Sequence, residues 1–223
     1  EFTLENYAKL FSANYGRIFL NTLKLAVIIT LLQLFTCSLA AFAFTKLHFP
    51  GRDKIFVAYL ATMMVPWHAI MIPQFIVVKA FGMYNTHLSL IVLQAFSAFG
   101  VFLLRQNMLS IPDSLHEAAK IDGCSTFGIY RKIILPLSQN GLATLTVLTF
   151  NSVWNDYMGP MIYLDSDRLK TIQLGLASFQ QQFSADYGAI MAGTVCSVIP
   201  IIIVYCIGQK YIVEGVAFAG VKG

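Results

Sequence analysis

The chain has 223 residues, of which 57% are hydrophobic and 12% are charged, and its mean hydropathy is +0.68. A soluble domain is about 45–50% apolar and about 25% charged, so this composition leaves too little polar surface to cover a water-soluble globule. The net charge of +4 includes no basic run longer than Arg131-Lys132, which argues against a nucleic-acid-binding surface. The composition indicates a protein of the lipid bilayer.

Five charge-poor apolar segments follow one another along the chain. They are residues 18–44, 55–78, 88–104, 138–164 and 189–207. Each has about the length that a helix needs to cross a hydrocarbon core. Barrel strands would instead be segments of about 10 residues with strict alternation, which is lacking here. The sequence therefore predicts an all-α polytopic membrane protein, with one transmembrane domain over residues 1–223.

Lysine and arginine counts predict the orientation of these spans. The connecting regions 45–54, 105–137 and 208–223 hold nine of these residues, and the regions on the other side hold five. Cytoplasmic loops carry the basic excess, so we expect the C-terminus to be cytoplasmic. The start, Glu1-Phe2-Thr3, has no initiator methionine or signal peptide and is then outside. We therefore expect a sixth, N-terminal span that is missing from this sequence.

The second segment contains two prolines. Pro66 and Pro73 each remove a helical backbone hydrogen bond, which a membrane helix tolerates where neighbours or a water-filled cavity satisfy the freed groups. The sequence therefore predicts a kinked helix. Two roles stay open for the kink, a gate or a static bend.

Polar residues gather near the end of the fourth segment. Asn151 and Asn155 lie one helical turn apart with Trp154 beside them, and Asp156 follows. Amides and an aromatic ring suit a sugar, whose hydroxyl groups need donors and acceptors and whose C–H face stacks on rings. Two interpretations stay open. These residues line a translocation path, or the amides join neighbouring helices and the acid is interfacial and partly hydrated.

The loop between the third and fourth segments, residues 112–136, is predicted to be a small folded unit. Ser114 and Glu117 have the spacing of a capping box at a helix start. Gly123 suits the left-handed position that follows a helix end. A second short helix is expected up to Pro136, with an apolar stripe of Phe127, Tyr130 and Ile134.

The same loop carries a longer pattern. Glu117-Ala118-Ala119 is followed after three residues by Gly123, after nine more by Ile133, and after one more by Leu135-Pro136. This pattern resembles the EAA loop of binding-protein-dependent ABC importer permeases. Trp154-Asn155 and the closing Gly220-Val221-Lys222-Gly223 resemble the maltose-type carbohydrate branch of that family.

The resemblance covers essentially the whole chain and implies a type I ABC importer permease fold. It implies a permease subunit of an ATP-driven importer of a sugar or oligosaccharide in a bacterial or archaeal plasma membrane. In that family the loop is a coupling helix that docks in a cleft of the ATPase. The expected coupling residues are Glu117, Ala118, Ala119, Asp122, Gly123, Ile133, Leu135 and Pro136.

The resemblance also implies partners. These are a second permease subunit, two cytoplasmic ATP-binding subunits and an extracytoplasmic solute-binding protein. We expect no cofactor on this chain, with ATP and Mg²⁺ on the partner ATPase. The chain has no GxxxxGK[ST] sequence, so the energy for transport must come from another chain.

Two other classes of function are alternatives to the importer. A secondary transporter or channel acting without an ATPase is the alternative, but the spans contain one acid and no visible repeat. No nucleophile–base pair or metal-ligand cluster supports an enzyme. The cysteines form no CxxC pair, so we expect buried free thiols; they are Cys37, Cys124, Cys196 and Cys206.

Overall fold

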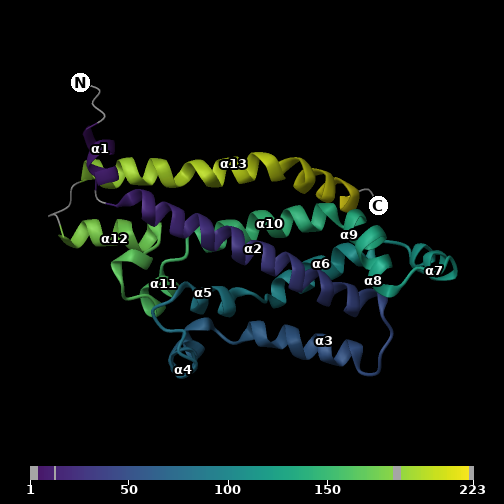
Figure 1. The fold of residues 1–223 in the computed structure, drawn as a ribbon. Helices are drawn as coiled ribbons and strands as arrows, with labels where there is room; N and C mark the ends of the chain where they lie inside the picture. Colours follow the sequence, from purple (N-terminus) through teal and green to yellow (C-terminus); the bar gives the residue numbers. More distant parts are fainter. Residues whose placement is uncertain (1–4, 13, 183–186, 221–223) are drawn as a thin grey trace. The chain divides into compact units, whose positions relative to one another are not determined.

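The computed structural model describes residues 5–12, 14–182 and 187–220, and this part of the chain is helical without a strand (Figure 1). The first helices are α1 (Glu5–Ser12), α2 (Tyr15–Lys46), α3 (Arg52–Ala61), η1 (Thr62–Met64), α4 (Trp67–Ala80), α5 (His87–Gln94) and α6 (Ala98–Leu109). They are followed by α7 (Asp113–Ile121), α8 (Thr126–Ile129), η2 (Tyr130–Ile134), α9 (Leu135–Leu137), α10 (Gln139–Trp154), α11 (Met158–Tyr163), η3 (Asp167–Leu169), α12 (Ile172–Gln182) and α13 (Tyr187–Gly220). The closing residues 221–223, which carry part of the family resemblance, lie outside the described residues.

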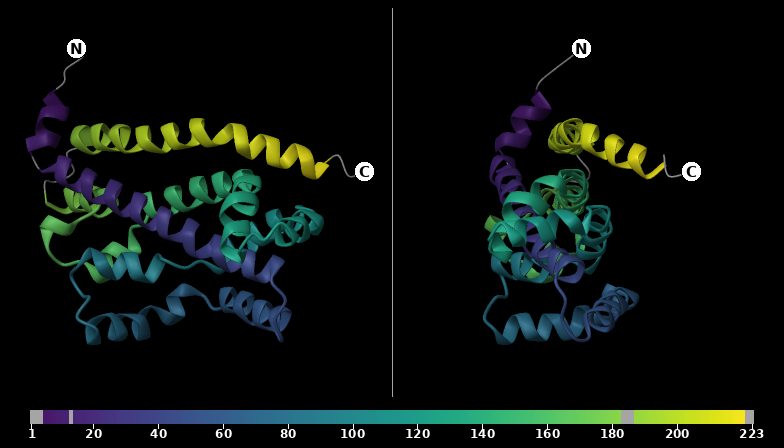
Figure 2. Two further views of the ribbon diagram at one scale, coloured as in Figure 1. Left: turned by 45° about the vertical axis from the view of Figure 1, so that its right-hand side comes forward. Right: turned by 90° about the vertical axis from the view of Figure 1, so that its right-hand side faces the viewer.

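The helices belong to two compact units. Unit 1 comprises residues 1–29, 71–93 and 149–206. Unit 2 comprises residues 30–70, 94–148 and 207–223. Within unit 2 the short helices α7, α8 and α9 lie together in both views of Figure 2.

By length and composition, up to five candidate membrane spans occur within the described residues. Two are single helices, Tyr15–Lys46 and Tyr187–Lys210. Three are helix pairs separated by a short break: Arg52–Met64 with Trp67–Ala80, His87–Gln94 with Ala98–Leu109, and Thr126–Leu137 with Gln139–Trp154. Each candidate overlaps one of the five apolar segments in the sequence, which agrees with an all-α polytopic protein.

The second segment is broken rather than gently kinked. A bend of 98° separates the helices on either side of Pro66. Proline disfavours the helical conformation for the residue before it, and Val65 is extended there, with φ −81° and ψ 115°. Pro73 lies inside α4 without ending it. The predicted distortion is therefore present as a break at Pro66, whereas α4 continues through Pro73.

The fourth segment also differs from the single helix predicted over residues 138–164. Helix α10 ends at Trp154, and the separate helix α11 begins at Met158. A carboxylate oxygen of Asp156 accepts the backbone N–H of Gly159 at 3.1 Å. A side-chain acceptor that satisfies a free N–H at a helix start stabilises a new helix. The polar residues that follow Trp154 therefore divide the segment.

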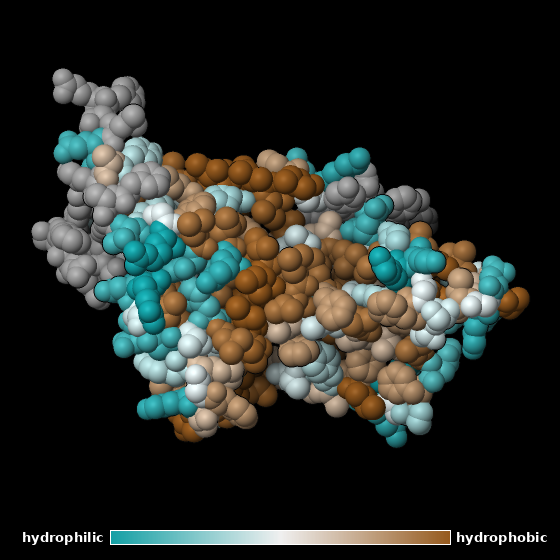
Figure 3. Space-filling model, viewed as in Figure 1, coloured by the Kyte–Doolittle hydropathy of each residue, from teal (hydrophilic) through white to brown (hydrophobic). Residues whose placement is uncertain are grey.

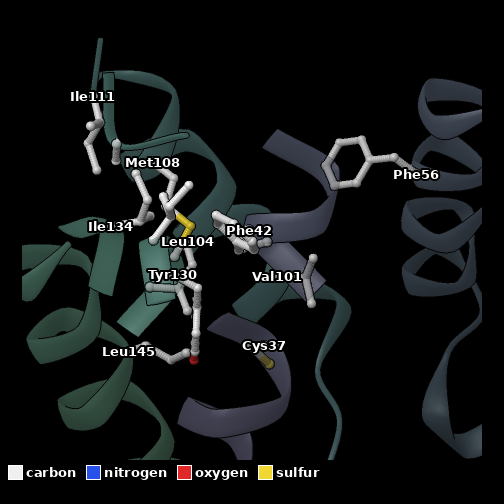
Figure 4. Close-up of a cluster of buried hydrophobic side chains, with 13 residues drawn as sticks. Cys37, Phe42, Phe56, Val101, Leu104, Met108, Ile111, Tyr130, Ile134 and Leu145 are labelled. Atoms are coloured by element: carbon white, nitrogen blue, oxygen red, sulfur yellow. The ribbon is translucent and has the colours of Figure 1, made fainter. Parts of the chain in front are cut away.

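The core of unit 2 is formed by side chains from α2, α3, α6, α7, α8, η2 and α10 (Figure 4). Its buried members are Cys37, Ala41, Phe42, Phe56, Val101, Leu104, Met108, Ile111, Ala119, Ile129, Tyr130, Ile134 and Leu145. One member, Ala119, belongs to α7, and three belong to α8 and η2. The predicted loop unit is thus anchored in this core.

Large apolar side chains are also exposed along most helices. Leu31 of α2 is 61% exposed and Ile76 of α4 is 62% exposed. Figure 3 shows broad apolar areas, in brown, over the surface where α2 runs. Soluble monomers rarely expose such areas. This surface suits lipid or further helices.

The four cysteines are free, as predicted, but only Cys37 is buried. Cys124 and Cys206 are exposed and Cys196 is half-buried. A cysteine in an apolar stretch is buried only where its face of the helix points toward a protein core. Cys124 instead lies in the exposed turn after α7.

Candidate functional site

Helix α7 begins earlier than the capping-box prediction requires. Its N-cap position is Pro112, which makes no side-chain capping bond, and the helix runs from Asp113. Ser114 therefore lies inside the first turn, and the predicted capping box with Glu117 is wrong. The first turn instead contains Asp113, whose negative charge is favourable near a helix N-terminus.

A lysine from α2 holds this helix start. Lys46 Nζ donates to the carbonyl oxygen of Ile111 and to a carboxylate oxygen of Asp113, both at 2.6 Å. The lysine side chain is 2% exposed, whereas that of Asp113 is 78% exposed. The hydrogen bond from Lys46 lowers the pKa of Asp113 below its ordinary value of 3.8. The end of α2 is therefore tied to the beginning of α7.

The end of α7 has the geometry that the sequence predicts. Gly123 has φ +81°, a left-handed conformation that glycine adopts without strain. Its N–H donates to the carbonyl of Lys120 at 3.1 Å, and the N–H of Cys124 donates to the carbonyl of Ala119 at 3.0 Å. These two bonds form a Schellman motif. They turn the chain sharply toward α8.

The Glu117-Ala118-Ala119 sequence divides between two faces of α7. Ala119 is buried in the unit 2 core, whereas Glu117 and Ala118 are exposed. Ile121, on the exposed side, is 86% exposed. Asp122 and Gly123 are exposed too. Ala119 packs the helix against the core, whereas Ala118 leaves room at the exposed surface beside Glu117 and Ile121.

The loop has two arms, α7 and the segment from α8 to α9, and the second arm places more side chains in the unit 2 core than α7 does. Ser125 Oγ accepts the N–H of Gly128 at 3.1 Å and caps α8. The hydroxyl of Tyr130 lies 2.8 Å from Ser38 Oγ, and its ring centroid lies 5.4 Å from that of Phe42. Tyr130 and Ile134 are buried as the predicted stripe requires, but Phe127 is 59% exposed.

The remaining positions of the EAA pattern lie in η2 and α9, before α10 begins. Ile133 and Leu135 are half-buried against the unit 2 core, and Pro136 is exposed. The chain turns at Ser138, whose hydroxyl donates to the carbonyl of Ile134 at 2.7 Å. The helices on either side are bent by 76°. The pattern therefore joins two short helical arms to one core.

Trp154 in unit 1 is a packing residue. Its side chain is fully buried, and its indole N–H donates to the carbonyl of Ser197 at 2.9 Å. Its ring contacts those of Phe19 and Phe150, each with centroids 5.4 Å apart. Because the side chain is fully buried, the Trp154 ring offers no face to a solute in this structure.

The amides beside it are exposed and linked. Asn155 Nδ2 donates to the side-chain oxygen of Asn151 at 3.0 Å, and Gln173 Nε2 donates to Asn155 Oδ1 at 3.2 Å. Asn151 and Asn155 are exposed and Gln173 is half-buried. Sequence reasoning missed Gln173, because α12 brings it to this place from outside the fourth segment. Asp156 is half-buried, and its carboxylate accepts a backbone N–H at the start of α11.

Within residues 5–12, 14–182 and 187–220, no three His, Cys, Asp or Glu side chains are grouped so that they could hold a metal ion. The polar contacts described above are hydrogen bonds and an ion pair. Such groups recognise surfaces and hydroxyl-rich solutes.

Comparison with known proteins decides the family. Residues 33–217 match the family described as binding-protein-dependent transport system inner membrane component. The chain belongs to this family. It is thus a multi-pass membrane permease, a transport component rather than an enzyme.

Several permeases are similar over nearly the whole chain. The arabinooligosaccharides transport system permease AraQ of Halalkalibacterium halodurans is 32% identical over 223 residues, covering 99% of this chain and 80% of the relative. The lactose permease LacG of Rhizobium radiobacter is 34% identical over 212 residues, covering 95% and 78%. The diacetylchitobiose permease NgcG of Streptomyces coelicolor is 32% identical over 219 residues, covering 96% and 72%.

The fold is similar to that of a solved transporter. The crystal structure of a bacterial ABC transporter that imports the acidic polysaccharide alginate matches with a TM-score of 0.82 and 27% identity. The match covers 93% of this permease and 79% of the solved chain. The permease therefore has the fold of an ABC importer membrane subunit, as the EAA resemblance implies.

Proposed function

We propose that this permease is a membrane subunit of an ATP-driven importer of a sugar or oligosaccharide. The observation that carries the substrate class is the similarity over 95% or more of the chain to permeases for arabinooligosaccharides, lactose and diacetylchitobiose. The exposed amide row of Asn151, Asn155 and Gln173 supports it, because it offers both donors and acceptors to hydroxyl groups. These amides line the translocation path, and Trp154 and Asp156 hold the local backbone that presents them.

The arms α7 to α9 dock on the partner ATPase. Glu117 makes a polar contact in the ATPase cleft, and Ala118 allows close approach, since both are exposed. Gly123 sets the angle between the arms. Force reaches unit 2 through the buried Ala119 and the Lys46 contacts. A helix that is held at several points moves as a rigid body, which transmits displacement better than a mobile loop.

The basic excess orients the molecule. Residues 45–54, 105–137 and 208–223 face the cytoplasm, where the ATPase binds ATP and Mg²⁺. The complete importer contains a second permease subunit, two ATP-binding subunits and an extracytoplasmic solute-binding protein. This chain forms half of the path, with one transmembrane domain over residues 1–223.

A matched pair of glycine variants tests the coupling role. Gly123 and Gly82 both have positive φ, +81° and +67°, both donate an N–H bond, and neither would crowd an added Cβ. Proline removes the N–H and requires φ near −65°. Gly123→Pro is expected to reach the membrane and abolish substrate-stimulated ATP hydrolysis and uptake. Gly82→Pro carries the same local perturbation away from α7 and should retain uptake. Normal uptake by Gly123→Pro would remove the coupling proposal.

A further inference from the structure

A basic pocket lies in the connection between α2 and α3, in unit 2. Its volume is about 410 Å³, and its lining residues are His48, Phe49, Gly51, Arg52, Asp53 and Lys54. Neither the EAA loop nor the amide row includes these residues. The pocket therefore needs a separate explanation.

The charge in and beside this pocket is predominantly positive. Asp53 is the one acid in the lining, and its carboxylate is already shared by two guanidinium groups. Arg52 Nε lies 3.2 Å from Asp53 Oδ1, and Arg105 Nη2 lies 3.7 Å from the same oxygen. Lys54 adds a third cation. Three positive charges against one negative charge make an anion the complementary ligand.

The cationic groups are held in place but retain free donors. Arg52 Nη1 donates to the carbonyl of Leu47 at 3.3 Å, and Arg105 stacks 4.3 Å from the ring centroid of Phe56. Among the described residues, Arg52 Nη2 and the ammonium group of Lys54 have no hydrogen-bond partner. A guanidinium held by protein contacts next to an unpaired ammonium is a favourable arrangement for phosphate oxygens.

The surroundings favour a lipid over a soluble anion. The pocket directly follows the candidate span that ends at Lys46. Directly beyond it, Ile55 and Val57 of α3 are 51% and 64% exposed, and Phe49 at its rim is 37% exposed. A ligand with an anionic head and apolar chains therefore matches both halves of this surface.

We propose that this pocket binds the phosphate headgroup of an anionic phospholipid, with its acyl chains lying along the exposed apolar residues of α3. The guanidinium of Arg52 and the ammonium of Lys54 donate to the phosphate oxygens. Gly51 also lines the pocket, has φ +79°, and has only Ile55 near the place of a side chain, so it leaves room for a ligand. The interaction does not depend on transport activity or on the identity of the transported solute.

Native mass spectrometry of the full-length permease, purified with its partner subunits, tests this site. Phosphatidylglycerol, phosphatidylcholine and inorganic phosphate are titrated in parallel. We expect phosphatidylglycerol to bind at least tenfold more tightly than phosphatidylcholine, with no competition from millimolar phosphate. Each basic side chain near an anionic lipid contributes about 1 kcal/mol, which is about fivefold in affinity. Lys54→Gln should therefore weaken binding about fivefold, and the double variant with Arg52→Gln about 25-fold.

Lys79→Gln is the matched control, because Lys79 is an exposed cation on α4, outside the pocket and outside α7 to α9. It should leave lipid affinity unchanged. Equal binding of the two lipids, or an equal loss in the control, would overturn the site. Displacement of the lipid by inorganic phosphate would assign the pocket to a soluble anion instead. Because uptake is not the readout, failure here leaves the proposed import function intact.

Discussion

Lys46 offers a sharp test of how α7 is attached. Its ammonium group makes two contacts of 2.6 Å, to the Ile111 carbonyl and to Asp113, and its side chain is 2% exposed. Lys46→Met keeps a long unbranched stem in the same space. The variant therefore removes both contacts and leaves the packing of α2 nearly unchanged.

The two contacts have different strengths. Asp113 is 78% exposed, so its ion pair is expected to contribute only about 0–1 kcal/mol after solvent screening. The bond to the Ile111 carbonyl is charge-assisted, and its loss costs about 1.5–3 kcal/mol. The variant no longer has to bury an ammonium group, and the desolvation free energy that is thereby avoided offsets part of both losses. The expected net change in unfolding free energy is about 1–2 kcal/mol, or a fall in Tm of about 2–8 °C.

The local effect should exceed the global one, because both contacts belong to the start of α7. Hydrogen exchange at residues 111–124 should accelerate about tenfold, the equivalent of about 1.4 kcal/mol, while exchange in α10 changes little. Substrate-stimulated ATP hydrolysis should fall in parallel. Lys46→Arg keeps a cation and should retain most of the protection. Unchanged exchange at α7 in Lys46→Met, with the variant folded, would refute the attachment.

Three further predictions concern the ion pair and unit 1. The lowered pKa of Asp113 means that its pairing with Lys46 stabilises the folded state above pH 3.8, and that this stabilisation is lost as pH falls through the lowered value. The Tm of wild type should therefore exceed that of Asp113→Asn near neutral pH, and the difference should vanish in acid. A Tm difference that stays constant with pH would contradict the ion pair. Trp154→Phe should lower unfolding free energy by about 1–2 kcal/mol through loss of the bond to Ser197, with uptake per folded molecule unchanged, whereas a changed substrate preference would indicate contact with the solute. Asn155→Ala should reduce uptake about tenfold at equal membrane abundance, as expected for lost solute hydrogen bonds worth about 1.4 kcal/mol, and a fall in abundance instead would assign the amides to helix packing.

Features that depend on local chemistry could be predicted from the sequence. Hydropathy located the apolar segments, since the cost of placing charge in lipid is a property of each segment alone. Gly123 could be placed at a helix end because only glycine adopts φ +81° readily. The EAA pattern identified the family because its spacing is carried within one loop.

Features that depend on distant contacts could not be predicted. The capping box failed because Lys46, far earlier in the chain, binds Asp113 and supports a helix start at that residue. The burial of Trp154 could not be predicted, because sequence does not reveal that Phe19 packs on its ring and that the carbonyl of Ser197 accepts its N–H. Gln173 was missed for the same reason. In each case the deciding partner is separated from the motif by at least one helix.

The central claim is that this permease works with a separate ATPase that docks on α7. Mass spectrometry of the proteins that co-purify with it in mild detergent tests that claim directly. For the wild-type chain we predict a second permease and an ATP-binding subunit, and for Gly123→Pro the second permease without the ATP-binding subunit. A wild-type chain that purifies alone and transports solute without ATP would contradict the account.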